Sequence, residues 1–223
     1  MSKLTAIIFD MDGLMVDSEP LSRQAWDEFL RPYGGRISDE MQSQIIGLRA
    51  DMSTPLIIAA YDIPLTVAEI IEQRKQIYTH IRAQGVPVMP GLWELQAYIA
   101  ERDIPWAVAS SSGRVHVNEM LAQLQLADKV YATACGDEVA HGKPAPDIYL
   151  LAAERLDIPP EKCLALEDSG PGSMAAVAAG MTVIAIPNGE TKNSDFSHVH
   201  YSYNSLHDVA TNLDMLVDKL PIF

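Results

Sequence analysis

Apolar residues along the chain gather in short continuous runs, and polar or glycine-containing segments follow most of them. Such runs are typical of strands that are buried on both faces of a parallel sheet. The predicted strands cover residues 5–9, 104–109, 129–134, 163–166 and 182–186, and a further edge strand and a closing helix are expected within residues 199–223. Helical spacing separates the later runs, over residues 92–101, 115–124, 146–156 and 172–179. This alternation predicts an α/β fold, a Rossmann-like parallel sheet with helices on both faces.

Residues 18–84 break the alternation, because they show helical periodicity without a convincing strand. Ser18 can cap the first helix and Gly34 can end it. The predicted helices cover residues 18–33, 38–46, 53–61 and 66–83. We therefore predict an α/β core domain of residues 1–15 and 88–223, with an inserted helical cap domain of residues 16–87. The short connections would permit the cap to open and close as a rigid body.

Composition and charge narrow the range of partners. A chain of 223 residues with 48% hydrophobic and 21% charged residues is ordinary for a folded protein. Its formal charge of −14 argues against nucleic acid and anionic membrane surfaces, which would repel it. Cys135 and Cys163 lack metal-site spacing and are expected to be buried thiols in a reducing compartment. No signal-peptide pattern or membrane span is evident, so we expect a cytoplasmic protein.

Two carboxylates follow the first predicted strand, in Asp10-Met11-Asp12-Gly13. Sites in open α/β sheets form outside the carboxyl ends of the strands, so both carboxylates can face one pocket. Paired carboxylates can act as nucleophile and proton donor if their environments differ. A calcium-type acidic loop or a solvated turn would show the same short pattern.

Hydroxyl and cationic side chains follow later strands. Ser110, Ser111 and Ser112 precede Gly113 and a predicted helix, an arrangement whose N–H groups and hydroxyls can bind an anion. Lys143 lies between a glycine and a proline and can neutralise phosphate charge. A plain turn and a solvated lysine are the alternatives for these two motifs.

Two further carboxylates, Glu167 and Asp168, directly follow the strand predicted at residues 163–166. Carboxylates at the end of a buried strand are costly unless a cation lies beside them. Oxygen ligands that leave room for water are typical of Mg²⁺ sites. The sequence therefore predicts that Mg²⁺ is the cofactor.

Together the motifs DMDGLMVDSE, VASSSG, GKPAPD and LEDSGPG, with a helical insertion after the first strand, identify a resemblance. The chain resembles the haloacid dehalogenase (HAD) superfamily of aspartate-nucleophile phosphatases. It is most similar to the branch that contains β-phosphoglucomutase and small sugar-phosphate phosphatases. This resemblance spans nearly the whole chain.

The resemblance implies a role for each motif. Asp10 would be the nucleophile that forms an aspartyl-phosphate, and Asp12 would be the general acid and then the general base. Phosphate would be held by Ser110, Ser111 and Lys143. The Mg²⁺ ligands would be Asp10, the main-chain carbonyl of Asp12, Asp168, and Glu167 either directly or through water. The physics agrees, because Mg²⁺ and Lys143 would offset the repulsion between a carboxylate and a phosphate dianion.

The cap is expected to select the substrate, a small phosphorylated metabolite such as a sugar phosphate. Candidate contacts are Arg49 and Lys75 in the cap and Arg114 in the core, although solvated helix charges are an equal alternative for the two cap residues. We expect a magnesium-dependent phosphatase that is a monomer or a weak dimer.

A phosphosugar mutase of the β-phosphoglucomutase type is the main alternative. The mutase branch has a histidine at the position of Ser22, and the cap has no histidine before His80, which favours the phosphatase. Dehalogenation would leave Asp12 without a role. Phosphonate cleavage would need a lysine in the first cap helix, where this chain has none. A catalytically silent binding protein would have lost Asp10, Asp12 or Lys143.

Overall fold

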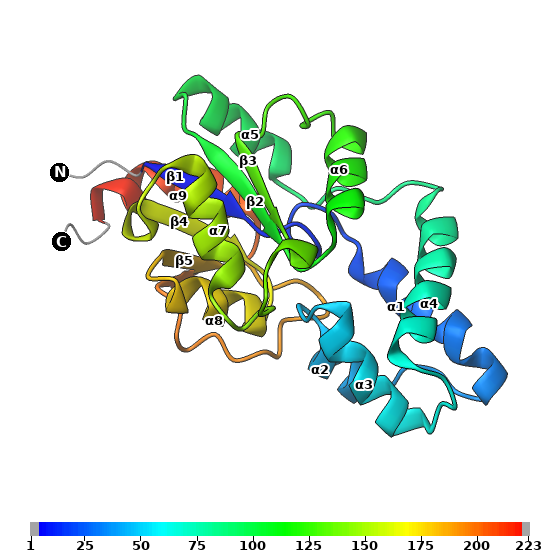
Figure 1. The fold of residues 1–223 in the computed structure, drawn as a ribbon. Helices are drawn as coiled ribbons and strands as arrows, with labels where there is room; N and C mark the ends of the chain where they lie inside the picture. Colours follow the sequence, from blue (N-terminus) through cyan, green and yellow to red (C-terminus); the bar gives the residue numbers. More distant parts are fainter. Residues whose placement is uncertain (1–4, 220–223) are drawn as a thin grey trace.

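A computed structural model describes residues 5–219, which form a six-stranded, wholly parallel sheet beside a group of helices (Figure 1). The strand order is β3-β2-β1-β4-β5-β6. The strands are β1 (Ala6–Phe9), β2 (Trp106–Ser110), β3 (Ala132–Cys135), β4 (Cys163–Glu167), β5 (Thr182–Ala185) and β6 (Tyr201–Ser202). The predicted α/β fold is confirmed.

The apolar run of β1 is buried on both faces because successive side chains alternate between two apolar clusters. Ile7 and Phe9 pack with α5 (Leu92–Glu101), α6 (Arg114–Gln123) and α9 (Leu206–Lys219). Ala6 and Ile8 pack with α7 (Asp147–Leu156) and α8 (Gly170–Ala178) on the opposite face. The prediction of helices on both faces is therefore confirmed, and β1 lies in the middle of the sheet with its end facing the cap.

A third apolar cluster lies entirely within the inserted segment, in its helices and the loops between them. Its buried members include Trp26, Phe29, Ile57 and Ile70, and none of its members comes from the sheet. The helices are α1 (Glu19–Leu30), α2 (Asp39–Ile45), α3 (Ala50–Tyr61) and α4 (Val67–Arg82), with the 3₁₀ turn η1 (Arg31–Tyr33) after α1. A helical insertion is thus confirmed, whereas its boundaries at residues 16 and 87 stay a prediction that the separate cluster favours.

N-terminal capping residues begin α2 and α4, as the Ser and Thr before these helices suggest. The hydroxyl of Ser38 accepts a hydrogen bond from the N–H of Met41, and Thr66 forms a capping box with Glu69. Ser18 occupies the N-cap position of α1, but its side chain makes no capping hydrogen bond. The expected capping role of Ser18 is therefore wrong.

Several strand ends differ from the predicted ranges by a few residues. The strand predicted from residue 104 starts at Trp106, directly after Pro105. The strand predicted from residue 129 starts at Ala132, because Lys129 and Val130 still donate to the carbonyl of Leu126 in a turn. Residues 220–223 of the predicted closing helix lie outside the described residues. Within residues 5–219, no helix is long and apolar enough to cross a membrane.

Candidate active site

The carboxyl ends of the three central strands bring the predicted catalytic residues to one edge of the sheet. Asp10 directly follows β1, and its N–H donates to the carbonyl of Leu166 in β4 at 3.0 Å. Ser110 ends β2, and Glu167 ends β4. Core and cap residues together line a cavity of about 650 Å³ at this edge, and Asp10, Asp12 and Ser110 lie in its lining.

Lys143 is the central cation of the site. Its Nζ lies 2.6 Å from Asp10 Oδ1 and 2.6 Å from Glu167 Oε1, and donates to the carbonyl of Ala109 at 3.1 Å. The side chain is only 1% exposed, and its ammonium lies 5.1 Å from the ring centre of Tyr149. A buried ammonium with two carboxylate partners stays charged, and the pKa of Lys143 is raised because their attraction outweighs its burial.

Glu167 is held on both of its oxygens. Oε1 accepts from Lys143 and, at 2.9 Å, from the hydroxyl of Tyr149. Oε2 accepts from the N–H and the hydroxyl of Ser169, both at 3.0 Å. The carboxylate fits only because residue 172 is a glycine, since a Cβ on Gly172 would lie 1.7 Å from Glu167 Oε1. The observed contacts tie Glu167 to Lys143, so a metal contact through water fits better than a direct one.

Three carboxylates are close enough to share a cation. One oxygen each of Asp10, Glu167 and Asp168 lies within 4.8 Å of the others. Asp168 Oδ2 accepts from Asn188 Nδ2 at 2.8 Å, whereas its buried Oδ1 has no hydrogen-bond partner. Burial raises the pKa of Asp10 to about 8 despite Lys143, and burial followed by the charge of Glu167 raises that of Asp168. A buried oxygen without a partner, in a cluster where burial disfavours the charged carboxylates, fits a hard divalent cation such as Mg²⁺.

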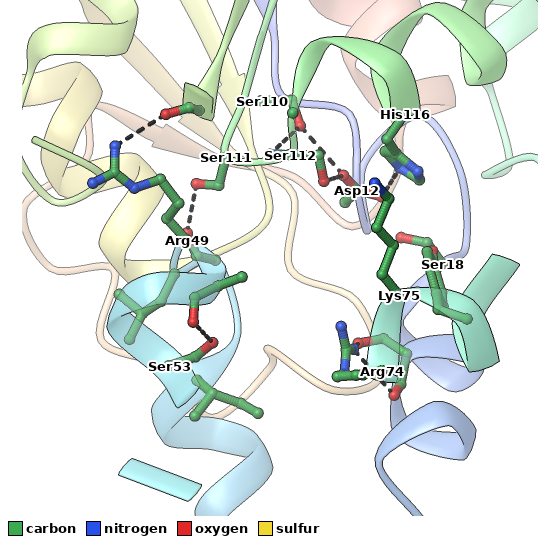
Figure 2. A pocket seen from close by; sticks show the side chains of 18 of the residues that line it. Asp12, Ser18, Arg49, Ser53, Arg74, Lys75, Ser110, Ser111, Ser112 and His116 are labelled. Atoms are coloured by element: carbon green, nitrogen blue, oxygen red, sulfur yellow. Dashed lines mark hydrogen bonds and ion pairs between the residues drawn. The ribbon is translucent and has the colours of Figure 1, made fainter. Parts of the chain in front are cut away.

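Asp12 lies in a different environment from Asp10. Its Oδ2 accepts from the hydroxyls of Ser112 at 2.9 Å and Ser110 at 3.3 Å, and its Oδ1 lies 3.1 Å from His116 Nε2 (Figure 2). Burial opposes its charge, but His116 and the hydroxyls of Ser112 and Ser18 outweigh burial and hold the pKa of Asp12 well below its usual range. The two aspartates therefore lie in different environments, and that of Asp12 favours the ionised form, which can take up a proton.

The predicted anion-binding serines face different neighbours. Ser110 is fully buried, and its hydroxyl accepts from the N–H of Ser112 at 3.1 Å. The hydroxyl of Ser111 donates to the carbonyl of Gly47 in the cap at 2.9 Å. Ser110 thus lies next to Asp12, whereas Ser111 joins the core to the cap.

Arg49 lines the cavity, but its guanidinium already has several partners. It pairs with both oxygens of Asp51 at 2.7 Å. It also reaches across to the core, where it donates to the carbonyls of Gly136 at 3.0 Å and Val139 at 2.8 Å. Arg49 therefore connects the cap to the core, which is a different role from the predicted contact with substrate.

The other two predicted substrate residues, Lys75 and Arg114, differ in their position relative to the cavity. Lys75 is exposed on α4 and lines the cavity, and its side chain extends toward the core (Figure 2). Arg114 is not among the residues that line the cavity, because its guanidinium binds Thr133 and Glu138 beside β3. Lys75 therefore lies where a substrate contact is possible, whereas Arg114 and its two partners lie outside the lining of the cavity.

The cap side of the cavity, which we call the cap wall, contains the polar residues Glu19, Ser22, Gln42 and Arg74, which are not among the site residues predicted from the sequence. Gln42 donates to Glu19 at 3.2 Å, but its Oε1 is buried without a partner. Arg74 donates to the hydroxyl of Ser22 at 2.6 Å and lies 4.4 Å from the ring centre of Trp26, while its Nε has no partner. Ser22 follows Glu19 by three residues and Trp26 follows Ser22 by four, which places these side chains on one face of α1 and is a signal that the sequence contains.

Comparison with known proteins agrees with this geometry. The chain is 35% identical to a probable pseudouridine-5′-phosphatase of Drosophila melanogaster, over 92% of this chain and 91% of that protein. It is 31% identical to a phosphorylated carbohydrates phosphatase of Thermotoga maritima, over 80% and 82% of the two chains. A β-phosphoglucomutase of Clostridium difficile has the same fold, with a TM-score of 0.85 and 20% identity over 96% and 97% of the two chains.

A match to the haloacid dehalogenase-like hydrolases extends over residues 4–180. This range includes the motifs at Asp10, Ser110, Lys143 and Glu167, which lie together in the fold. The predicted resemblance is therefore confirmed, and the chain belongs to the haloacid dehalogenase-like hydrolase family.

Proposed function

We propose that this protein is a magnesium-dependent phosphatase that hydrolyses a phosphorylated sugar through an aspartyl-phosphate on Asp10. The observation that carries the proposal is the position of Asp10 at the cavity, with one oxygen held by Lys143 at 2.6 Å and Asp168 beside it. A fixed carboxylate next to a cation is suited to attack on phosphorus. Relatives named as phosphatases support the same reaction.

Mg²⁺ would be held by Asp10, Asp168 and the main-chain carbonyl of Asp12, with Glu167 contributing through water. When bound, it would neutralise the charge of the phosphate and of the attacking carboxylate. The unpartnered Oδ1 of Asp168 supports this set of ligands. Both oxygens of Glu167 are already engaged by protein donors, which supports its indirect role.

The protein's own side chains would carry the two chemical steps. Asp10 attacks the phosphorus, and the bond from phosphorus to the sugar oxygen breaks while Asp12 gives that oxygen a proton. Water then attacks the aspartyl-phosphate, gives a proton to Asp12, and releases Asp10 as a carboxylate. Lys143, Ser110 and the N–H groups near Ser111 would hold the phosphoryl oxygens in both steps.

The cap, which we place at residues 16–87, would select the sugar. Gln42 Oε1 and Arg74 Nε are buried at the cavity without partners, and such atoms are costly unless a ligand pairs with them. A sugar hydroxyl can donate to the amide oxygen and accept from the guanidinium. The phosphorylated carbohydrates that one relative's name gives as substrates would supply such hydroxyls.

A phosphosugar mutase stays the second candidate, since the fold is shared with a β-phosphoglucomutase. A mutase must protect its phospho-enzyme from water. Ser22 replaces the histidine of the mutase branch, and its hydroxyl is held by Arg74 at 2.6 Å. These contacts favour the phosphatase.

Phosphate release from an aryl phosphate and from a panel of sugar phosphates tests the proposal. We expect activity that a chelator abolishes and added Mg²⁺ restores. Asp10→Asn should form no phospho-enzyme, whereas Asp128→Asn, at an exposed position outside the cavity, should behave as wild type. Near-normal turnover by Asp10→Asn, or full activity in excess chelator, would contradict the mechanism. Transfer of phosphate to a second sugar position without release would favour the mutase.

A further inference from the structure

The imidazole of His116 forms a hydrogen bond with the carboxylate of Asp12, and within residues 5–219 no other aromatic side chain does so. His116 is in the first turn of α6 in the core, and its Nε2 lies 3.1 Å from Asp12 Oδ1. The side chain is 14% exposed and lines the cavity. The sequence motifs gave no role to this residue. Its position beside Asp12, the proposed general acid and base, suggests a role in catalysis.

The second ring nitrogen of His116 determines what the first can do. His116 Nδ1 lies 3.2 Å from NH1 of Arg82, at the end of α4 in the cap. A guanidinium only donates hydrogen bonds, so Nδ1 must accept and Nε2 must carry the proton. The N–H of Nε2 then donates to Asp12. Arg82 therefore selects the tautomer that supports the carboxylate.

Neighbours on both sides fix the ring and the guanidinium in place. Arg82 also forms an ion pair with Glu119, one helical turn after His116 on α6. The ring of Tyr78 lies 5.9 Å from the imidazole, tilted by 39°. The hydroxyls of Ser110 and Ser112 can rotate away from Asp12, but the imidazole N–H cannot. His116 is thus a hydrogen-bond donor whose direction toward Asp12 is fixed by its neighbours.

We propose that His116 is a positioning residue that holds the Asp12 carboxylate where it takes a proton from the hydrolytic water, and that Arg82 of the cap sets the tautomer required. This inference rests on the proposed function. In the step concerned, the water oxygen bonds to phosphorus and the bond from phosphorus to Asp10 breaks, leaving the electron pair on Asp10. The water proton goes to Asp12, and His116 neither gains nor loses a proton.

The two half-reactions should therefore depend on His116 to different extents. An aryl phosphate has a leaving group that needs no proton, so Asp12 is dispensable for forming the phospho-enzyme from it. Hydrolysis of the phospho-enzyme still needs Asp12 in position. Misplacement of a catalytic group by about 1 Å can cost on the order of a hundredfold in rate. Loss of His116 should slow only the second step.

The experiment follows 4-nitrophenyl phosphate hydrolysis by quenched flow in the Mg²⁺-loaded protein. His116→Leu should lengthen the lifetime of the phospho-enzyme at least about tenfold, with a burst of nitrophenol equal to the enzyme concentration. Its kcat and KM should fall together, so that kcat/KM stays unchanged. His116→Gln places an amide donor near the position of Nε2 and should recover most of the rate. Arg82→Met should give a smaller defect of the same kind.

His80→Leu is the matched control, because His80 is exposed on α4 in the same cap helix as Arg82. It should behave as wild type. A fall in kcat/KM with an unchanged phospho-enzyme lifetime in both His116 variants would show a merely structural role and overturn the inference. Wild-type kinetics in His116→Leu would overturn it as well. If the wild-type protein turns over but forms no phospho-enzyme, the covalent mechanism fails and this inference fails with it.

Discussion

Replacement of Lys143 by methionine should destabilise the fold and abolish activity for two separable reasons. Methionine keeps most of the length of the side chain but removes the ammonium that lies 2.6 Å from both Asp10 and Glu167. Glu167 is fully buried, so its charge would be left with only the neutral donors Tyr149 and Ser169. In the Lys143→Met variant, the negative charge of Glu167 is therefore buried without a cation beside it.

The size of the effect follows from this burial. Removing one partner of a buried ion pair costs about 3–5 kcal/mol. The second variant Lys143→Met/Glu167→Gln removes the stranded charge, so it should be more stable than Lys143→Met alone. Residues in contact show coupling energies of about 0.5–3 kcal/mol in such double-mutant cycles, and the upper end is expected here.

Urea unfolding in the presence of a chelator measures these free energies of unfolding without the contribution of a metal. Hydrolysis of an aryl phosphate with Mg²⁺ measures catalysis in parallel. The double variant should stay inactive even where its stability recovers, because nothing replaces the cation beside the phosphoryl group. Unfolding of Lys143→Met at the wild-type urea concentration would refute the reasoning. Simple additivity of the two single replacements would refute it too.

Three further predictions concern the cap and its contact with the core. Gly47→Ala should lower kcat about tenfold, because Gly47 has a φ of +78° and an added Cβ would lie 2.6 Å from Ser169 Oγ. Gly34→Ala is the matched control, because Gly34 has a φ of +71° but an added Cβ there would have no atom within 4 Å. Arg49→Ala should reduce kcat/KM on acetyl phosphate and on a sugar phosphate alike, since Arg49 binds core carbonyls, and a loss on the sugar phosphate alone would contradict this role. Burial raises the pKa of Glu19 from its ordinary 4.5 to about 7, so its carboxyl binds a proton more tightly in the folded state and stability falls as pH rises through 7. Glu19→Gln should therefore melt above wild type at pH 8 but not at pH 5, and the reverse order would be evidence against it.

The arrangement of the core site could be predicted because parallel strands end at one edge of the sheet. Once Asp10, Ser110 and Glu167 were placed after predicted strands, the fold brought them together without further information. The α/β class followed from apolar runs that are buried on both faces. Local patterns were sufficient for these features.

The cap wall could not be predicted, because it depends on how each helix is rotated toward the core. Arg74 and Lys75 are neighbours in sequence but differ by about 100° around a helix of 3.6 residues per turn. Only the packing of α4 makes Arg74 a partner of Ser22 and leaves Lys75 exposed. The partners of Arg114 could not be predicted either, because Thr133 and Glu138, which bind its guanidinium, lie in segments whose distance from it no spacing reveals.

The central place of β1 has a consequence for how the chain folds during synthesis. Its neighbours in the sheet are β2 and β4, which end at Ser110 and Glu167, so the apolar residues of β1 leave the ribosome long before either partner strand exists. The cap helices have an apolar cluster of their own and can pack as soon as they emerge. β1 therefore has no partner strand for about a hundred residues of elongation, and the cap can already be folded for the last part of that interval. Protection from aggregation is needed most during this interval, and the catalytic site assembles only later, once β4 has also been made.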